Sequence, residues 1–183
     1  MATLPEIVNY LEADDALHLG RLLVLIDAFG GRSGDKQIEG LTKLAKLDFL
    51  LRYPDYLERA LIARDVLNPA IDVHDFERHS IEAHMVRFKY GPWDHRYRRF
   101  LNTLAGRGLV AVGQSGRTIM IGLTVRGREA AASLREEPEY AAIGQRAALL
   151  KRHLDLSATT LMEFVYATFP EVASLRLGET IEQ

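Results

Sequence analysis

The stretch FLNTLAGRGLVAVGQSGRTIMIGLTVRGREAA, which runs from Phe100 to Ala131, decides the expected fold. Its first residues complete a helix that we predict over residues 94–105, with Asp94 as the N-cap. Large apolar side chains recur in this segment at intervals of three and four residues, so they form one stripe along the helix. The stripe consists of Tyr97, Phe100, Leu101 and Leu104. The opposite face carries His95, Arg99 and Asn102, with Arg96 and Arg98 on its flanks.

A β-hairpin is predicted directly after this helix. Gly106 and Gly108 end the helical pattern, and residues 109–112 and 118–123 follow with the apolar spacing of strands. The Gly-rich segment 113–116 lies between them and predicts the turn. Thr124 then stands where a helix N-cap is expected, before a helical segment that runs to Glu136 and ends before Pro138.

The rest of the chain reads as amphipathic helices separated by Gly, Pro and polar residues. The predicted helices are residues 14–29, 38–52, 55–63, 139–154 and 158–169, followed by a polar tail. In the second of these, the leucines are expected to face the core and Glu39, Thr42, Lys43 and Lys46 to face water. We therefore predict a mainly α protein with a small β-hairpin (α+β). Its expected parts are an N-terminal helical region (1–63), a loop-rich connector (64–90), the helix and hairpin (91–136), and a C-terminal helical extension and tail (137–183).

Composition restricts the class of protein. The chain has 183 residues, 48% of them apolar, and contains no cysteine, which excludes disulfides, thiolate metal sites and a cysteine nucleophile. Its apolar runs are too short to span a bilayer, so we expect a cytoplasmic protein without membrane contact. GGRSGDK, at residues 30–36, lacks the Gly-Lys-Ser/Thr ending of a phosphate-binding loop, and no HExxH motif is present. We accordingly expect no enzymatic activity, no cofactor and no metal.

Charge is distributed unevenly along the chain. The net charge is only −2, but residues 84–127 carry +7 and the remainder carries −9. A basic segment on an acidic protein is typical of a surface that binds nucleic acid, and is also typical of one that binds an acidic protein. The residues predicted to bind nucleic acid are Lys89, Arg96, Arg98, Arg99, Asn102, Arg107 and Arg117.

The order helix, Gly-Leu break, two strands with an Arg-containing turn, and Thr-capped helix resembles the second half of a winged helix-turn-helix domain of the MarR type. The resemblance implies a recognition helix at residues 94–105 and a wing tip at residues 114–117, with extra N- and C-terminal helices around the domain. In such domains the recognition helix enters the major groove, and the wing reaches phosphate or the minor groove.

A second stretch, LTKLAKLDFLLRYPDYLERAL at residues 41–61, resembles the middle component of bacterial three-component ABC-ATPase systems of the Lamassu type, which defend against phages. In those systems a winged-helix subunit accompanies a long coiled-coil ATPase of the SMC type and an effector. The resemblance implies a noncatalytic adaptor that bridges the ATPase subunit, the effector subunit and double-stranded DNA.

Two alternatives use the same residues. A free-standing transcription regulator would be a homodimer that binds a spaced pair of half-sites with sequence selectivity. A pure protein-interaction module would instead bring the basic face against an acidic protein and would have negligible affinity for DNA.

Overall fold

The computed structural model describes residues 4–67, 69–71, 85–86, 96–174 and 180–181. It is mainly helical with a small antiparallel sheet, an α+β winged-helix arrangement, so the predicted fold class is confirmed. The elements are α1 (Leu4–Gly30), β1 (Ile38–Glu39), α2 (Leu41–Arg52), α3 (Pro54–Ile62), β2 (Met85–Val86), α5 (Arg96–Gly106), β3 (Val110–Ser115), β4 (Thr118–Leu123), α6 (Val125–Arg135), α7 (Pro138–Leu154), α8 (Ala158–Thr168), α9 (Pro170–Ser174) and β5 (Thr180–Ile181).

The sheet adds a third strand to the predicted hairpin. Its order is β1-β4-β3, with Ile38 opposite Ile121. The prediction that a helix begins at residue 38 was wrong, because Gly40, at φ +88°, turns the chain out of β1 and α2 begins only at Leu41. The Gly40 amide donates to the Ile119 carbonyl over 2.7 Å and holds this corner against β4. A strand of two residues is too short to show a periodicity of its own.

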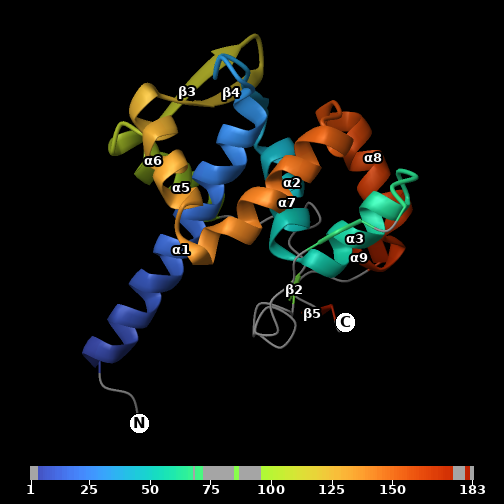
Figure 1. Ribbon diagram of the computed structural model, residues 1–183, viewed down its shortest axis with the longest axis horizontal. Helices are drawn as coiled ribbons and strands as arrows, with labels where there is room; N and C mark the ends of the chain where they lie inside the picture. Colours follow the sequence, from blue (N-terminus) through green and yellow to red (C-terminus); the bar gives the residue numbers. More distant parts are fainter. Residues whose placement is uncertain (1–3, 68, 72–84, 87–95, 175–179, 182–183) are drawn as a thin grey trace.

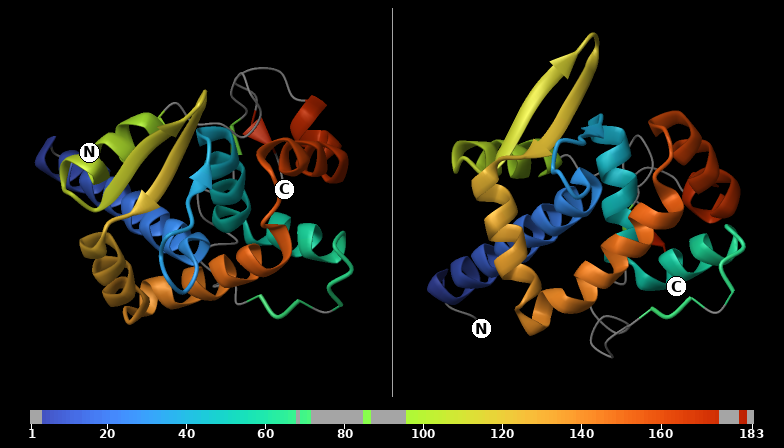
Figure 2. Two further views of the ribbon diagram at one scale, coloured as in Figure 1. Left: turned by 90° about the horizontal axis from the view of Figure 1, so that it is seen from above. Right: turned by 45° about the horizontal axis from the view of Figure 1, so that its top comes forward.

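The wing, β3 and β4 with their turn, is longer than predicted. β3 continues through Gly113 and Gln114, and Ser115 pairs with Thr118. The turn therefore consists of Gly116 and Arg117, with Gly116 at φ +60°, and the prediction of a turn over residues 113–116 was wrong. Gly113 is tolerated inside a strand because β3 is an exposed edge of the sheet. The wing rises above the body of the protein, with α5 beside its base (Figures 1 and 2).

The core forms around α1 and α2. α5 lies on one side of α1 and α6 and α7 lie on the other (Figure 2), and the predicted stripe of α5 is buried. α2 is enclosed so fully that every residue from Lys43 to Leu51 is buried. The expectation that Lys43 and Lys46 face water was therefore wrong. Lys46 lies against Tyr166 of α8, and Lys43 pairs with Asp155 at the end of α7.

The two ends of the chain contain more secondary structure than predicted. α1 starts at Leu4, ten residues before the predicted start, and its first half projects beyond the other elements (Figure 1). Further along the chain, Pro138 was predicted to end a helix, and it lies instead in the first turn of the next helix, α7. Proline is tolerated there because the amide hydrogen that it lacks would have no partner within the helix. Part of the predicted polar tail is helix α9, which buries Val172 completely, and β5 pairs with β2.

Candidate nucleic-acid interface

The expected recognition helix, α5, is fixed to the body through a buried carboxylate. Tyr97 of α5 donates its hydroxyl proton to Asp48 Oδ2 of α2 over 2.5 Å. Arg21 of α1 donates to both Asp48 oxygens, from Nε over 2.7 Å and from Nη2 over 3.1 Å. Burial alone would raise the pKa of Asp48, but the Arg21 charge and the hydrogen bonds from Arg21 and Tyr97 outweigh it and hold that pKa below its usual value. One ionised carboxylate thus joins α1, α2 and α5.

His18 supports the same helix from α1. Its ring stacks on Phe100 of α5 with 5.4 Å between ring centres. Burial first, and then the neighbouring Arg21 charge, lower the pKa of His18 to about 3, so the imidazole is neutral at physiological pH. Because Arg21 Nη2 lies 2.7 Å from Nδ1, the guanidinium donates and Nδ1 is the unprotonated acceptor. Phe100 of the buried stripe therefore packs on a neutral imidazole of α1.

The opposite face of α5 is exposed, as predicted. Arg98, Arg99 and Asn102 are exposed, and Arg96 is half-buried with its guanidinium 5.7 Å from the Phe100 ring centre. Arg99 forms an ion pair with Asp15 of α1, with 2.9 Å between Nη2 and Oδ1, although 57% of its side chain remains exposed. This face therefore presents Arg98 and Asn102 directly, whereas a ligand must compete with Asp15 for Arg99.

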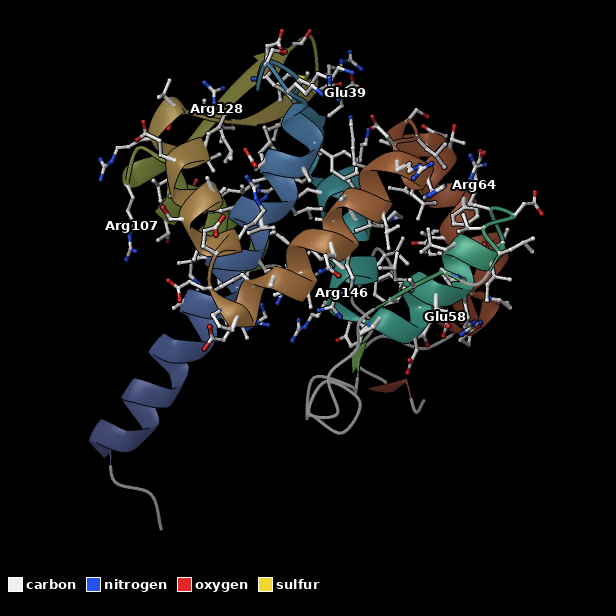
Figure 3. All side chains as sticks on the ribbon, viewed as in Figure 1. Glu39, Glu58, Arg64, Arg107, Arg128 and Arg146 are labelled. Atoms are coloured by element: carbon white, nitrogen blue, oxygen red, sulfur yellow. The ribbon has the colours of Figure 1, made fainter. Side chains whose placement is uncertain are left out.

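Two further predicted residues, Arg107 and Arg117, lie at the two ends of the wing. Arg107 is exposed in the turn between α5 and β3 and points away from the body (Figure 3). Arg117 is exposed at the wing tip, separated from Arg107 by the length of β3. Lys89, like Asp94 and His95, lies outside the described residues.

One exposed arginine was missed as a candidate. Arg126, in the first turn of α6, was included in the charge of the basic segment but was not assigned to the predicted site. The structure brings it to the α5–β3 turn, where its Nη1 lies 3.9 Å from the position that a Cβ atom on Gly108 would occupy. By contrast, Arg128, labelled in Figure 3, is half-buried, and its Nη1 donates to the Gly34 carbonyl over 3.1 Å.

A second group of cations, also missed, lies between α2, α7 and α8. Asp155 accepts hydrogen bonds from Lys43 and Lys151, and both ammonium groups lie within 6 Å of the Phe29 ring centre. Lys46 is only 2% exposed and lies 5.3 Å from the Tyr166 ring centre. Burial lowers the pKa of Lys46 to about 8. Lys43 and Lys46 were missed because the sequence pattern placed them on a solvated helix face.

Comparisons with protein-family models, curated proteins and solved structures gave no match. Within the described ranges, no helix combines the length and apolar character that a membrane span requires. The same part of the chain contains no cluster of three or more histidine or carboxylate side chains arranged to hold a metal ion.

Proposed function

We propose that this protein is a noncatalytic winged-helix subunit that binds duplex DNA through α5 and the wing. The observation that carries the proposal is the charge of residues 96–128, which contain seven arginines and no acidic residue. Five of those arginines are exposed, namely Arg98, Arg99, Arg107, Arg117 and Arg126. We call these five residues the arginine surface.

The chemistry of this surface favours binding to the DNA backbone over the reading of sequence. Guanidinium groups contact phosphate oxygens, and each neutralised phosphate releases counterions, which makes affinity depend steeply on salt. Among the exposed side chains of α5, Asn102 is the amide able to form two hydrogen bonds with adenine. We therefore expect affinity that varies little with sequence.

We further propose that the protein is an adaptor in an antiphage defence complex, where it bridges an SMC-like ABC-ATPase, an effector and DNA. This part rests on the resemblance of residues 41–61 to Lamassu-type middle components. It is supported by two large exposed apolar side chains next to that segment, Ile62 at 57% and Leu67 at 90%. Co-purification with a coiled-coil ATPase would support the adaptor, whereas a stable homodimer with tight, sequence-selective DNA binding would favour a transcription regulator.

The direct test is the affinity of an Arg98→Ala variant for duplexes of different sequence. We expect binding to weaken by a similar factor on every duplex, and the slope of log K against log salt to become shallower by about 0.9, the value for one lost phosphate contact. Fluorescence anisotropy over a salt series measures both quantities. Arg152→Ala, which removes an exposed arginine from α7, is the matched control. An equal loss of DNA affinity in Arg98→Ala and Arg152→Ala would contradict the assignment of α5 and the wing as the DNA-binding surface.

Asp15→Asn is expected to tighten DNA binding by about two- to fivefold. The substitution releases Arg99 from an exposed ion pair, and such pairs contribute up to about 1 kcal/mol. The salt slope should also steepen by up to about 0.9, because Arg99 becomes available to a phosphate. Glu163→Gln, which makes the same change of charge on α8, is the control. If it tightens binding equally, net charge and not the Asp15–Arg99 pair explains the effect.

A further inference from the structure

The junction between α5, the wing and α6 is held by a dense set of hydrogen bonds. The Thr124 amide donates to the Leu109 carbonyl over 3.1 Å, and its hydroxyl donates to the Gly108 carbonyl over 2.7 Å. The same hydroxyl oxygen accepts from the Gly127 amide over 3.0 Å and so caps α6. A Cβ atom on Gly127 would lie 1.9 Å from the Leu109 carbonyl oxygen, so the two backbones meet too closely for any side chain. The first turn of α6 is therefore fixed against the turn between α5 and β3.

This rigid junction brings two arginines to the same turn, the one between α5 and β3. Arg107 directly precedes Gly108, and the Arg126 guanidinium lies next to Gly108. Both side chains are exposed. Neither arginine forms an ion pair within the described part of the chain. Glu129, the nearest acidic residue along α6, is a partner of neither. Two cations at one turn with no anion among the described residues repel each other, so the pair favours a ligand whose negative charge both can share.

We propose that Arg107 and Arg126 together bind a backbone phosphate of duplex DNA, as a second anchor in addition to Arg117 at the wing tip. This inference rests on the proposed function and specifies how the surface contacts its ligand. A phosphodiester has two free oxygens, and guanidinium groups bind such oxygens in paired hydrogen bonds. Because the junction is already rigid, little backbone freedom is lost when the phosphate binds.

The distance between the two anchors indicates how much DNA is contacted. They are separated by β3, whose six residues span about 20 Å at roughly 3.3 Å per residue. Residues 110–115 carry no charge, so the wing between its ends offers phosphate no further cation. A distance of about 20 Å corresponds to roughly six base pairs along a duplex. Both anchors are therefore engaged only by a duplex longer than this.

The test compares the Arg107→Ala/Arg126→Ala variant with Arg117→Ala on a duplex of about two helical turns and on one of about four base pairs. On the long duplex, the double variant should bind about tenfold more weakly, with a salt slope shallower by about 0.9, the value for the one phosphate that both arginines share. The short duplex reaches only one anchor at a time. The loss of affinity caused by Arg117→Ala should therefore be smaller on the short duplex than on the long duplex. The thermal melt of the double variant should stay unchanged, because both side chains are exposed.

Two further measurements test whether the arginines act by paired hydrogen bonds and not by charge alone, and whether DNA binds at both anchors. Arg107→Lys/Arg126→Lys keeps both charges but loses the paired geometry, so it should restore the salt slope and leave the affinity reduced. Inorganic phosphate at matched ionic strength should compete poorly, because it occupies only one anchor. If the wild type binds DNA and the double alanine variant binds equally well with the same slope, this inference is wrong and the proposed function stands. If the wild type does not bind DNA at low salt, the proposed function itself fails.

Discussion

Replacing Asp48 with alanine is expected to lower the free energy of unfolding by about 3–5 kcal/mol, the usual effect of removing one partner from a buried ion pair. Asp48 is 1% exposed and accepts hydrogen bonds from Arg21 and Tyr97. The variant leaves the buried Arg21 charge without this carboxylate and removes the acceptor of the Tyr97 hydroxyl. Urea unfolding followed by circular dichroism measures the loss.

Asp155→Ala provides the matched control, because it also removes a carboxylate bound to cations. Its partners are Lys43 and Lys151, but the Asp155 side chain is 36% exposed, so water replaces much of what is lost. We expect a loss of about 1 kcal/mol or less. A similar loss of unfolding free energy in Asp48→Ala and Asp155→Ala would mean that the Asp48 network stabilises the protein no more than a surface ion pair does.

The Asp48 variant should also change the response to acid. The pKa of Asp48 lies below 3.8, so the stability from its ionised form is fully present above that pH and is lost as the pH falls through the lowered value. Wild type should therefore lose more stability than Asp48→Ala when the pH is lowered below about 4. Parallel acid curves for the two proteins would contradict an ionised Asp48 in the folded state.

Local signals in the sequence were sufficient to predict α5, the presence of the hairpin and the cap of α6, but not the position of the hairpin turn. The spacing of Tyr97, Phe100, Leu101 and Leu104 gave the buried side of α5 correctly, because an amphipathic helix packed on one side has a simple 3.6-residue pattern. The same phase placed Arg98 and Asn102 on the exposed side. Thr124 caps α6 as predicted, since its side chain accepts from an amide only three residues away.

Features that depend on distant parts of the chain were not predictable. Arg99 and Asp15 are 84 residues apart and Arg21 and Asp48 are 27 apart, so no local pattern links the members of either pair. α2 was misjudged for a related reason. Its pattern shows one apolar face, but packing from several sides buries its polar residues as well. A helix that is buried all round is recognisable from sequence only when it is apolar all round.

Lys46 gives the second large expected effect, in the opposite direction to Asp48. It is buried against Tyr166, and within the described residues no carboxylate lies within ion-pair distance of its ammonium group. Burial lowers its pKa from 10.5 to about 8. Folding below pH 8 therefore buries a charge at a cost of roughly 3 kcal/mol, and this cost disappears as the pH rises from about 8 towards 10.5.

Lys46→Met keeps the apolar stem and removes the charge, so we expect it to raise the free energy of unfolding by about 1–3 kcal/mol at pH 7. The gain should shrink at pH 9.5, because the wild type then folds with a neutral amine. Tyr56 and Tyr97 do not obscure this range, since burial raises the pKa of both phenols above 10. Lys43→Met is the control, because the Lys43 amine has Asp155 as its partner and its removal should not stabilise the protein. An equal difference between wild type and Lys46→Met at pH 7 and 9.5 would show that Lys46 does not titrate in this range, and would contradict the burial of an unpaired ammonium.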